Sequence, residues 1–265
     1  MSVLPIVVLY NVDYHKTNVY KTLLCHESVT NILLYENSSK PMNKQYASDR
    51  VVYRHDPNNG GVSAAYNYGA SVARQMAGIE ALLLLDEDTS FEPDYLKTLD
   101  QLLERHHDIG LFVPQILYQG DKPFSPIRRR LCKERGALLP EGRYSLHHYL
   151  PVNSGACVRL SLFERIGGYN DRIRLDFADF DFFARLGELS DVFYRVNSTA
   201  SQSFSNDETD NDRLYKRYLF YLEGAKEAHR NKLIRRMVNM EVLRHTLALT
   251  MRTHSLRFLI KYVNK

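Results

Sequence analysis

The most constraining feature of the sequence is a short apolar run that leads directly into three acidic residues. Residues 81–85 read Ala-Leu-Leu-Leu-Leu, and Asp86, Glu87 and Asp88 follow them. A run of this length is typical of a strand buried on both faces of a parallel sheet, although leucines alone would also suit a helix. The acidic side chains then lie at the carboxyl end of a strand, where open α/β sheets bind ligands. Asp86 and Asp88 can there share a divalent cation that also holds a diphosphate. The alternative is an acidic turn that caps the next helix.

The rest of the first 115 residues alternates between predicted strands and predicted helices, which is the pattern of βαβ units. Right-handed crossovers between parallel strands place all the strand ends on one side of the sheet. We therefore expect an α/β fold in which the polar residues after each strand meet at one edge. Strands are predicted at 4–9, 31–35, 51–53, 81–85 and 109–113, and helices at 16–26, after Gly61 and at 94–105.

A pair of glycines, Gly60 and Gly61, follows Asn59 and precedes small residues that begin a helix containing Asn67. Glycines let the backbone turn tightly and approach a ligand closely. The free N–H groups at the start of a helix form a candidate phosphate site. A plain turn into a helix is the alternative. The segment matches neither GxGxxG nor GxxxxGK[ST], so two common nucleotide-binding motifs are absent here.

The charge of the chain is unevenly distributed. The net formal charge is +4, yet residues 232–265 carry eight Lys and Arg residues against one acid, Glu241. The same segment places Leu233, Met237, Met240, Leu243 and Leu247 near one face of a predicted helix. A basic amphipathic helix binds anionic membrane surfaces; the alternative is a helix that packs on the domain or on a second subunit of an oligomer. Nucleic-acid binding is not expected, because the body is net negative and carries no groove-reading motif.

The three cysteines, Cys25, Cys132 and Cys157, are far apart and lack metal-ligand spacing. They fit buried thiols in a reducing cytoplasm. We expect no signal peptide, and no apolar run approaches the length that spans a bilayer. A cytoplasmic protein that reaches the inner face of the plasma membrane through its basic tail is consistent with these features.

The polar residues at the ends of the predicted strands are Tyr10-Asn11, Glu36-Asn37, Asn59-x-Gly61 with Asn67, and Asp86 to Asp88. Taken in order, they resemble the front half of a family 2, GT-A-fold inverting glycosyltransferase. The resemblance covers about residues 3–205 and implies an α/β, Rossmann-like, mostly parallel sheet flanked by helices, with a helical C-terminal extension. It implies that the strand ends hold a nucleotide-sugar, with Glu36 by the base, Asp86 by the sugar and Asp88, of the DxD motif, on Mg²⁺ or Mn²⁺. Family members more often have Asp at the position of Glu36. The nucleotide-sugar residues so implied are Tyr10, Asn11, Glu36, Asn37, Asn59, Gly61, Asn67 and Asp86.

The back half supplies a candidate base. Three acids interleaved with aromatic residues follow Leu175, and buried acids are costly unless they are paired or used. Inverting transfer needs a carboxylate to accept the proton of the acceptor hydroxyl. The resemblance implies Asp179 as this base, with Asp176, Asp181 and Arg185 in support. Ala178 replaces the usual Glu, and the pattern of acids is similar to rhamnosyltransferase-like and galactofuranosyltransferase-like branches. An acidic helix N-terminus is the alternative.

Three further stretches bear on the site. Ser154 and Gly155 resemble the strand at which family members bind the sugar and acceptor, although a cramped buried strand also fits. Residues 119–146 contain Arg128, Arg129, Arg130, Lys133 and Arg135, which suit either a solvated loop or a flexible loop that meets phosphate. Many relatives carry a metal-binding His shortly beyond the base, but residues 200–206 contain none. Gln202 is a weak substitute, and His147, His148 or His229 could approach from elsewhere.

These features together predict a glycosyltransferase. The resemblance implies a GT-A domain at 1–206, with a nucleotide-sugar half at 1–115 and an acceptor half at 116–206, and a basic helical extension at 207–265. The implied donor is a dTDP- or UDP-sugar carrying rhamnose, galactofuranose or another hexose. The implied acceptor is a glycan or lipid-linked hydroxyl in bacterial surface polysaccharide synthesis, such as that of O-antigen. A sugar-nucleotide nucleotidyltransferase and a non-catalytic nucleotide-binding partner are the alternatives.

Overall fold

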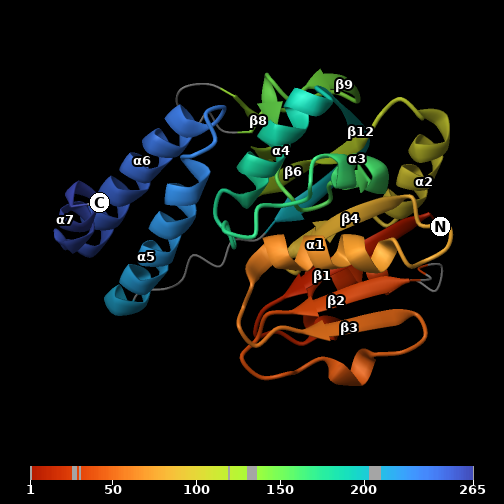
Figure 1. The fold of residues 1–265 in the computed structure, drawn as a ribbon, viewed down its shortest axis with the longest axis horizontal. Coiled ribbons are helices and arrows are strands. Elements are labelled where there is room, and N and C mark those ends of the chain that lie inside the picture. Colours follow the sequence, from red (N-terminus) through yellow and green to blue (C-terminus); the bar gives the residue numbers. More distant parts are fainter. Residues whose placement is uncertain are drawn as a thin grey trace.

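The computed structural model describes residues 2–25, 29, 31–118, 120–129, 136–202 and 210–264. A mixed sheet of ten strands runs through this part of the chain (Figure 1). Its first four strands in spatial order are parallel, as expected, and its other half contains antiparallel strands. The order across the sheet is β3 (Val51–His55), β2 (Ile32–Glu36), β1 (Val3–Leu9), β4 (Ala81–Asp86), β11 (Cys157–Arg159), β6 (Leu111–Tyr118), β12 (Val192–Gln202) and β5 (Thr89–Phe91). The short strands β7 (Lys122–Ser125) and β9 (Gly142–Ser145) pair with β6 and β12, and β8 (Ile127–Arg128) pairs with β10 (Tyr149–Leu150).

Two hydrophobic cores cover the two faces of the sheet. One core joins the sheet to α1 (Gly61–Ala73), α3 (Leu160–Arg165) and α4 (Ala178–Leu189). The other joins it to α2 (Tyr95–Arg105) and to two short helical turns, η1 (Tyr14–Lys16) and η2 (Tyr20–Leu24). A further short turn, η3 (Lys44–Tyr46), precedes β3. The sheet is therefore a middle layer whose strand ends are free to form a site.

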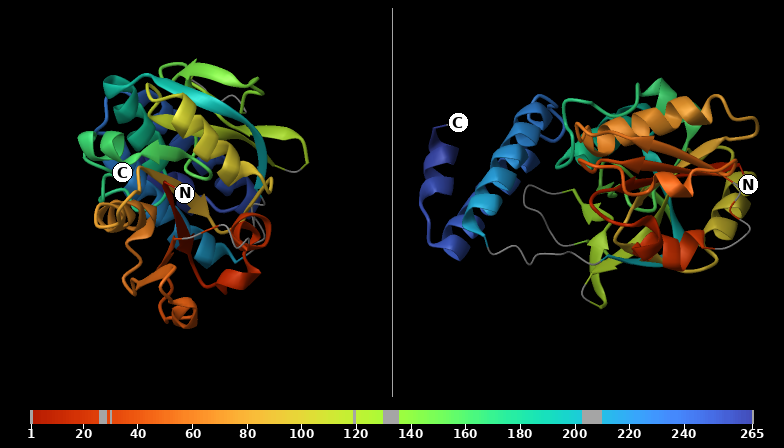
Figure 2. Two further views of the ribbon diagram at one scale, coloured as in Figure 1. Left: turned by 90° about the vertical axis from the view of Figure 1, so that its right-hand side faces the viewer. Right: turned by 90° about the horizontal axis from the view of Figure 1, so that it is seen from below.

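The C-terminal helices lie beside this layered body, at the end of the molecule opposite the N-terminus (Figures 1 and 2). They are α5 (Asn211–Ala228), α6 (Arg235–Thr253) and α7 (Arg257–Val263). α5 is tied to the segment before α4, because Arg217 donates to both oxygens of Asp176 at 2.6 and 2.8 Å. Tyr221 of α5 packs on Phe177, with ring centroids 4.9 Å apart.

Several elements differ from the expectation. The predicted helix at 16–26 is a pair of separate turns, η1 and η2, and the predicted strand at 109–113 runs from Leu111 to Tyr118. In the segment 152–158 only Cys157 and Val158 belong to a strand, because Asn153–Ala156 form a turn. The longest strand, β12, was not predicted, since its polar residues 197–199 interrupt the apolar pattern and coincide with a register shift between Arg195 and Thr199.

The outer helix α6 buries a different face from the predicted one. Val238, Val242 and Leu249 are buried, whereas Leu247 and Met251 point outward with 42% and 69% exposure. The thiols also differ from expectation, because Cys157 is buried but Cys25 is exposed; Cys132 lies outside the described residues. No helix in the described chain has the length and apolar character needed to cross a bilayer.

Two glycines have the same φ angle but differ in how closely other atoms approach them. Substitutions at these positions therefore separate the cost of steric crowding from that of backbone strain. Gly61 and Gly78 both have φ +79°, but a Cβ at Gly61 would overlap the Arg174 carbonyl, whereas nothing lies within 4 Å of one at Gly78. We expect Gly78→Ala to lower the free energy of unfolding by about 1 kcal/mol and Gly61→Ala by about 3 kcal/mol or more. Urea unfolding measures both. Equal losses would show that crowding against the Arg174 carbonyl adds no cost beyond the backbone strain.

Candidate functional site

The acidic turn lies at the carboxyl ends of the parallel strands, as predicted. Val8 of β1 is in register with Asp86 of β4, and Leu9 with Glu36 of β2. The polar residues that follow β1, β2 and β4 therefore meet at one edge. Asp86, Glu87 and Asp88 are each half-buried there.

Of the carboxyl groups at this edge, Asp86 has the pKa that is raised the most. Burial raises the pKa of its carboxyl to about 7, and the nearby charges of Asp88 and Asp179 add to this effect. A hydrogen bond from the Tyr66 hydroxyl, at 3.4 Å, acts in the opposite direction. The influence of Asp179 on Asp86 means that the fold brings the predicted base and the acidic turn together. Negative charge accumulates at one point, which is suited to a cation.

Asp88 is joined to Gln202, a residue 114 positions away. Gln202 lies opposite Thr89 in the pairing of β12 with β5, and its Nε2 donates to Asp88 Oδ1 at 3.2 Å. Burial raises the pKa of Asp88. The Gln202 Oε1 atom is buried and has no hydrogen-bond partner among the described residues.

These two side chains fit a hard divalent cation, because both present oxygen atoms and one oxygen lacks a partner. The described part of the chain holds no group of three His, Cys, Asp or Glu residues suited to a metal. A cation here would accordingly take further ligands from a diphosphate and water. His147 does not approach, since it faces Glu188 and Asp191 instead. Residues 203–206 of the stretch that lacks the His lie outside the described residues.

Glu87, which had no assigned role, fixes the backbone of Tyr10. Its Oε2 accepts the Tyr10 amide at 2.9 Å. Burial raises the pKa of Glu87 to about 7, despite this hydrogen bond. The Glu87 carbonyl accepts the Asn18 amide at 3.0 Å, so the acidic turn also holds the segment after β1. Tyr10 itself is exposed, with its ring available at the edge.

Glu36 and Asn37, at the end of β2, behave differently from each other. Glu36 is fully buried, and its oxygens accept the amides of Met42 and Asn43 and the Tyr53 hydroxyl. Burial would raise its pKa, but these hydrogen bonds outweigh it and lower the pKa. Glu36 thus organises the 42–43 loop, and its contact with a base stays a prediction. Asn37 Oδ1 is buried without a partner among the described residues, which leaves it available to a ligand.

The segment around α1 packs against the turn that leads to α4. The Val62 amide donates to the Arg174 carbonyl at 2.8 Å, so the start of α1 is already occupied where a phosphate site was predicted. Asn67 accepts the Tyr169 amide at 2.8 Å and donates to the Tyr169 carbonyl and to Asp171. Gly61 and Asn67 therefore hold protein backbone. Asn59 has φ 49°, a left-handed conformation in the turn before the helix.

Ser154 and Gly155 lie beside the acidic turn and support it. Ser154 is fully buried; its Oγ donates to Thr89 Oγ1 at 2.8 Å and accepts the Asp86 amide at 3.4 Å. A Cβ on Gly155 would lie 2.7 Å from Pro114 and 2.8 Å from Phe91, and this glycine has φ +79°. Gly155 therefore lies in a sterically crowded segment, which is the alternative interpretation of this stretch given in the sequence analysis.

The residues predicted to support Asp179 form hydrogen bonds and ion pairs that fix the neighbouring segments. Asp181 is 3% exposed and accepts hydrogen bonds from Arg185 Nε at 2.9 Å and Asn231 Nδ2 at 3.1 Å. Arg185 also donates to the carbonyls of Ile166 and Gly168. Residues two apart on a helix lie on nearly opposite faces, so Asp179 and Asp181 point different ways. Asp176, paired with Arg217, anchors α5.

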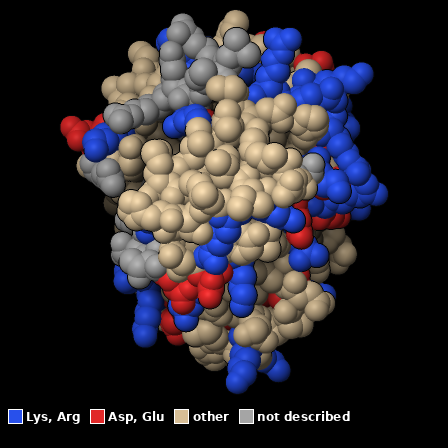
Figure 3. All heavy atoms as spheres, turned by 90° about the vertical axis from the view of Figure 1, so that its left-hand side faces the viewer, with Lys and Arg blue, Asp and Glu red and all other residues tan. Residues whose placement is uncertain are grey.

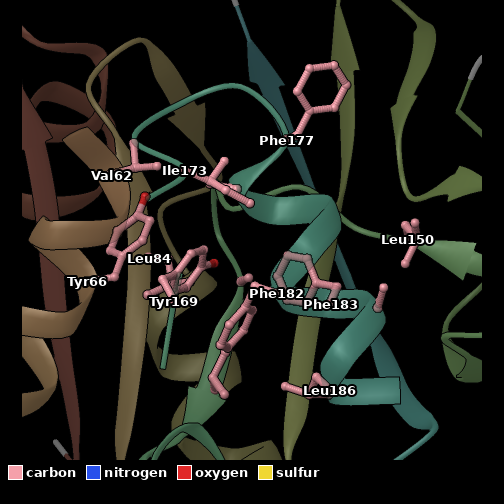
Figure 4. Close-up of a cluster of buried hydrophobic side chains, with 14 of the residues drawn as sticks. Val62, Tyr66, Leu84, Leu150, Tyr169, Ile173, Phe177, Phe182, Phe183 and Leu186 are labelled. Carbon is pink, nitrogen blue, oxygen red and sulfur yellow. The ribbon is translucent and has the colours of Figure 1, made fainter. Parts of the chain in front are cut away.

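Two features near Asp179 were not predicted. Phe177, just before α4, has φ 70°, which is strained for a bulky residue and persists because Tyr221 packs on it. Tyr66 and Tyr169 are buried side by side near Asp86, and Tyr169 stacks on Phe182 with centroids 4.1 Å apart (Figure 4). The Tyr169 hydroxyl donates to Asn153. Tyr66 and Tyr169 are far apart in the sequence, so the sequence alone does not reveal that they pack together.

Part of the basic loop contacts the connection between α5 and α6. Arg129 Nη2 donates to the Leu233 carbonyl at 2.7 Å, and the Arg128 guanidinium lies 5.9 Å from the centre of the Tyr149 ring. Arg130, Lys133 and Arg135 lie outside the described residues.

Comparison with known proteins places this geometry in context. The family model described as glycosyl transferase family 2 matches residues 7–164. GalNAc-T7, solved with UDP, GalNAc and Mn²⁺, has a TM-score of 0.60 at 13% identity over 96% of this chain and 58% of its own. TarS 1–349 from S. aureus, in complex with UDP, has a TM-score of 0.56 at 14% identity over 84% of this chain and 65% of its own. The chain thus spans less than two thirds of either length, and the likeness concerns the fold. No curated protein sequence matches.

The pKa of Asp86 makes the stability of the protein depend on pH. The pKa of this carboxyl is raised from 3.8 to about 7, so the folded state binds the proton more tightly than the unfolded state. Its contribution to stability is therefore complete below about pH 4 and is lost as the pH rises through 7. We expect Asp86→Asn to raise the free energy of unfolding by about 1–3 kcal/mol at pH 8 and by less at pH 5. Urea unfolding at the two pH values measures the difference.

Asp108→Asn is the matched control. The hydrogen bond from Arg143 lowers the pKa of Asp108, so loss of this charge should weaken the fold at pH 8. A change of the same sign in both variants would contradict the assignment of Asp86.

Proposed function

The chain belongs to glycosyl transferase family 2, and we propose that it transfers a sugar, with inversion, from a nucleotide-sugar to a hydroxyl of a glycan or lipid-linked acceptor. The observation that carries this proposal is the position of Asp86, whose pKa is raised to about 7 by burial, with the nearby charges of Asp88 and Asp179 adding to the shift. Such clusters of carboxylates are costly to a fold, and their presence at a strand-end edge supports a ligand that brings positive charge.

Mg²⁺ or Mn²⁺ would be held by Asp88, with Gln202 Oε1 as a second protein ligand. The partnerless oxygen of Gln202 and its hydrogen bond to Asp88 support this assignment. A bound cation would offset the charge of the leaving diphosphate. Tyr10, Asn11, Asn37 and Asp86 would contact the nucleotide-sugar, since Tyr10 is exposed at the edge and Asn37 Oδ1 has no partner in the described chain.

Asp179 is the proposed base. It stands in the first turn of α4, and its charge acts on Asp86 and on the buried Tyr169 hydroxyl. In this position it would accept the proton of the acceptor hydroxyl as that oxygen attacks the anomeric carbon. The strained Phe177 and the Asp176–Arg217 pair orient the turn that carries it.

The donor would be a UDP- or dTDP-sugar with rhamnose, galactofuranose or another hexose, used in bacterial surface polysaccharide such as O-antigen. The GalNAc-T7 and TarS structures were solved with UDP, which supports a uridine nucleotide. A nucleotidyltransferase is the weaker alternative, because no Gly-rich, Lys-bearing phosphate loop occurs near the N-terminus. A non-catalytic nucleotide-binding partner would bind nucleotide without turnover.

We assign residues 207–265 to an extension that places the enzyme on the inner face of an anionic membrane. Five exposed apolar side chains project from the outer side of the last two helices: Leu247, Met251, Leu256, Ile260 and Val263. Figure 3, which faces the C-terminal helices, shows a broad area free of charged residues whose border is made mainly of Lys and Arg, with some Asp and Glu. Arg236 and Lys261 are exposed and have no carboxylate partner in the described chain. Apolar side chains beside free cations are complementary to anionic lipid.

A thermal-shift screen tests the donor site. We expect UDP or dTDP with Mn²⁺ to stabilise the intact protein by about 2.7 kcal/mol at 100-fold excess over Kd. Asp88→Ala should abolish the metal-dependent part and Gln202→Ala should reduce it, whereas Asp179→Asn should bind normally but lose slow donor hydrolysis by about 10²-fold or more. Glu104→Gln, on α2, is the control. Stabilisation that is unchanged in Asp88→Ala would overturn the site, and pyrophosphate exchange would favour the nucleotidyltransferase.

Vesicle flotation tests the membrane contact. The triple variant Met251→Ser, Leu256→Ser, Ile260→Ser should lose most binding to vesicles of phosphatidylcholine and phosphatidylglycerol, because it removes apolar surface without changing charge. The triple variant Leu138→Ser, Leu175→Ser, Leu189→Ser removes exposed apolar side chains elsewhere and should bind like the wild type. Unchanged flotation of the first variant, or a dimer in sedimentation that only this variant abolishes, would assign the surface to a second copy of the chain.

A further inference from the structure

A cavity lies away from the acidic edge, where the C-terminal segment meets α4. Its volume is about 540 Å³, and it is lined by residues of α4, of the turn at 170–172 and of the segment 227–232. Asp181 and Arg185 form its inner wall, on the side of α4 opposite Asp179. The cavity is therefore distinct from the strand-end site.

The acids of this cavity are already engaged. Asp181 is held by Arg185 and Asn231, as described above, and Glu227 pairs with Arg230 at 3.1 Å. Arg172 and Lys232 also line the cavity, are exposed, and have no carboxylate partner in the described part of the chain. Two positive charges thus remain uncompensated at the mouth.

The unengaged donors match a phosphate group better than a carboxylate. Arg172 presents a planar fork and Lys232 a compact charge, which together can reach several oxygens of one anion. Asn170 also lines the cavity, and its Oδ1 accepts the Arg172 amide, which ties the backbone of Arg172 to this wall. The cavity has room for a diphosphate or for a phosphate with its substituent.

The cavity lies between the α/β body and the C-terminal extension. Asn231 bonds to Asp181 of α4, and Lys232 directly follows Asn231 at the start of the basic tail. Arg185, in the same wall, holds the turn at 166–168. An anion bound here would therefore bridge the extension to the turn beside α4.

We propose that this cavity is a binding site for a phosphomonoester or diphosphate group, held by Arg172 and Lys232 at the joint between α4 and the C-terminal helices. The group belongs either to a soluble phosphorylated molecule or to a lipid headgroup. The site does not depend on the acidic edge, so it goes beyond the proposed transfer reaction.

Inorganic pyrophosphate is the probe, titrated calorimetrically into the full chain in EDTA. Without a cation the acidic edge repels pyrophosphate and does not contribute. We expect the double variant Arg172→Gln, Lys232→Gln to bind at least about tenfold more weakly, since each lost charged hydrogen bond contributes more than a neutral one. The double variant Lys97→Gln, Arg105→Gln removes one Lys and one Arg from α2 and should bind like the wild type. Asp88→Ala should also bind normally, which separates this result from the donor site.

Flotation with phosphatidic acid vesicles distinguishes a lipid source from a soluble one. If the wild type ignores pyrophosphate but floats with phosphatidic acid, and the Arg172, Lys232 double variant loses this flotation while still floating with phosphatidylglycerol, the ligand is a lipid phosphomonoester. The proposal is overturned if the double variant matches the wild type, within twofold, in both pyrophosphate affinity and flotation. Thermal unfolding confirms that the variants are folded; both side chains are exposed, so little loss is expected.

Discussion

The position of Asp86, a half-buried carboxyl close to the charges of Asp88 and Asp179, is the constraint around which this structure is built. Asp86, Asp88 and Asp179 come from β4, from the turn after it and from α4. Burial raises the pKa of Asp86 and of Asp88, and the charges of Asp88 and Asp179 add to the shift at Asp86. Without other interactions, repulsion between these carboxylates would separate β4 and the turn after it from α4. The rest of the fold holds it together through two hydrophobic cores, one on each face of the sheet.

Much of the polar network serves this restraint. Asn67 binds the backbone at 169, Arg185 binds the carbonyls at 166 and 168, and Ser154 reaches both the Asp86 amide and Thr89. Each interaction fixes a turn whose position decides where a carboxylate points. Asn67, which the sequence suggested as a ligand contact, therefore holds protein backbone in this structure.

The sequence predicted the first half of the fold, residues 1–115, well and the second half poorly, for a physical reason. The first strands are continuous apolar runs followed by polar turns, and this local pattern is sufficient. β12 has no such pattern, because its polar middle coincides with a shift in pairing that only the neighbouring strands determine. The convergence of Asp86, Asp88 and Asp179 followed from strand ends and a family resemblance. The roles of Asn67, Asp181 and Tyr169 depend on contacts between residues far apart in the chain, so a single sequence does not reveal them.

The joint between α4 and α5 has a consequence for how such enzymes diversify. Asp176 is bound by Arg217, Asp181 by Asn231, and the left-handed Phe177 is covered by Tyr221. Three features at the start of α4 are thus completed by side chains from α5 and from the connection between α5 and α6. A C-terminal segment borrowed from a relative would keep the orientation of α4 only if it brought equivalents of these three residues with it. Recombination between family members is accordingly constrained at the seam between the two parts, as much as within either part.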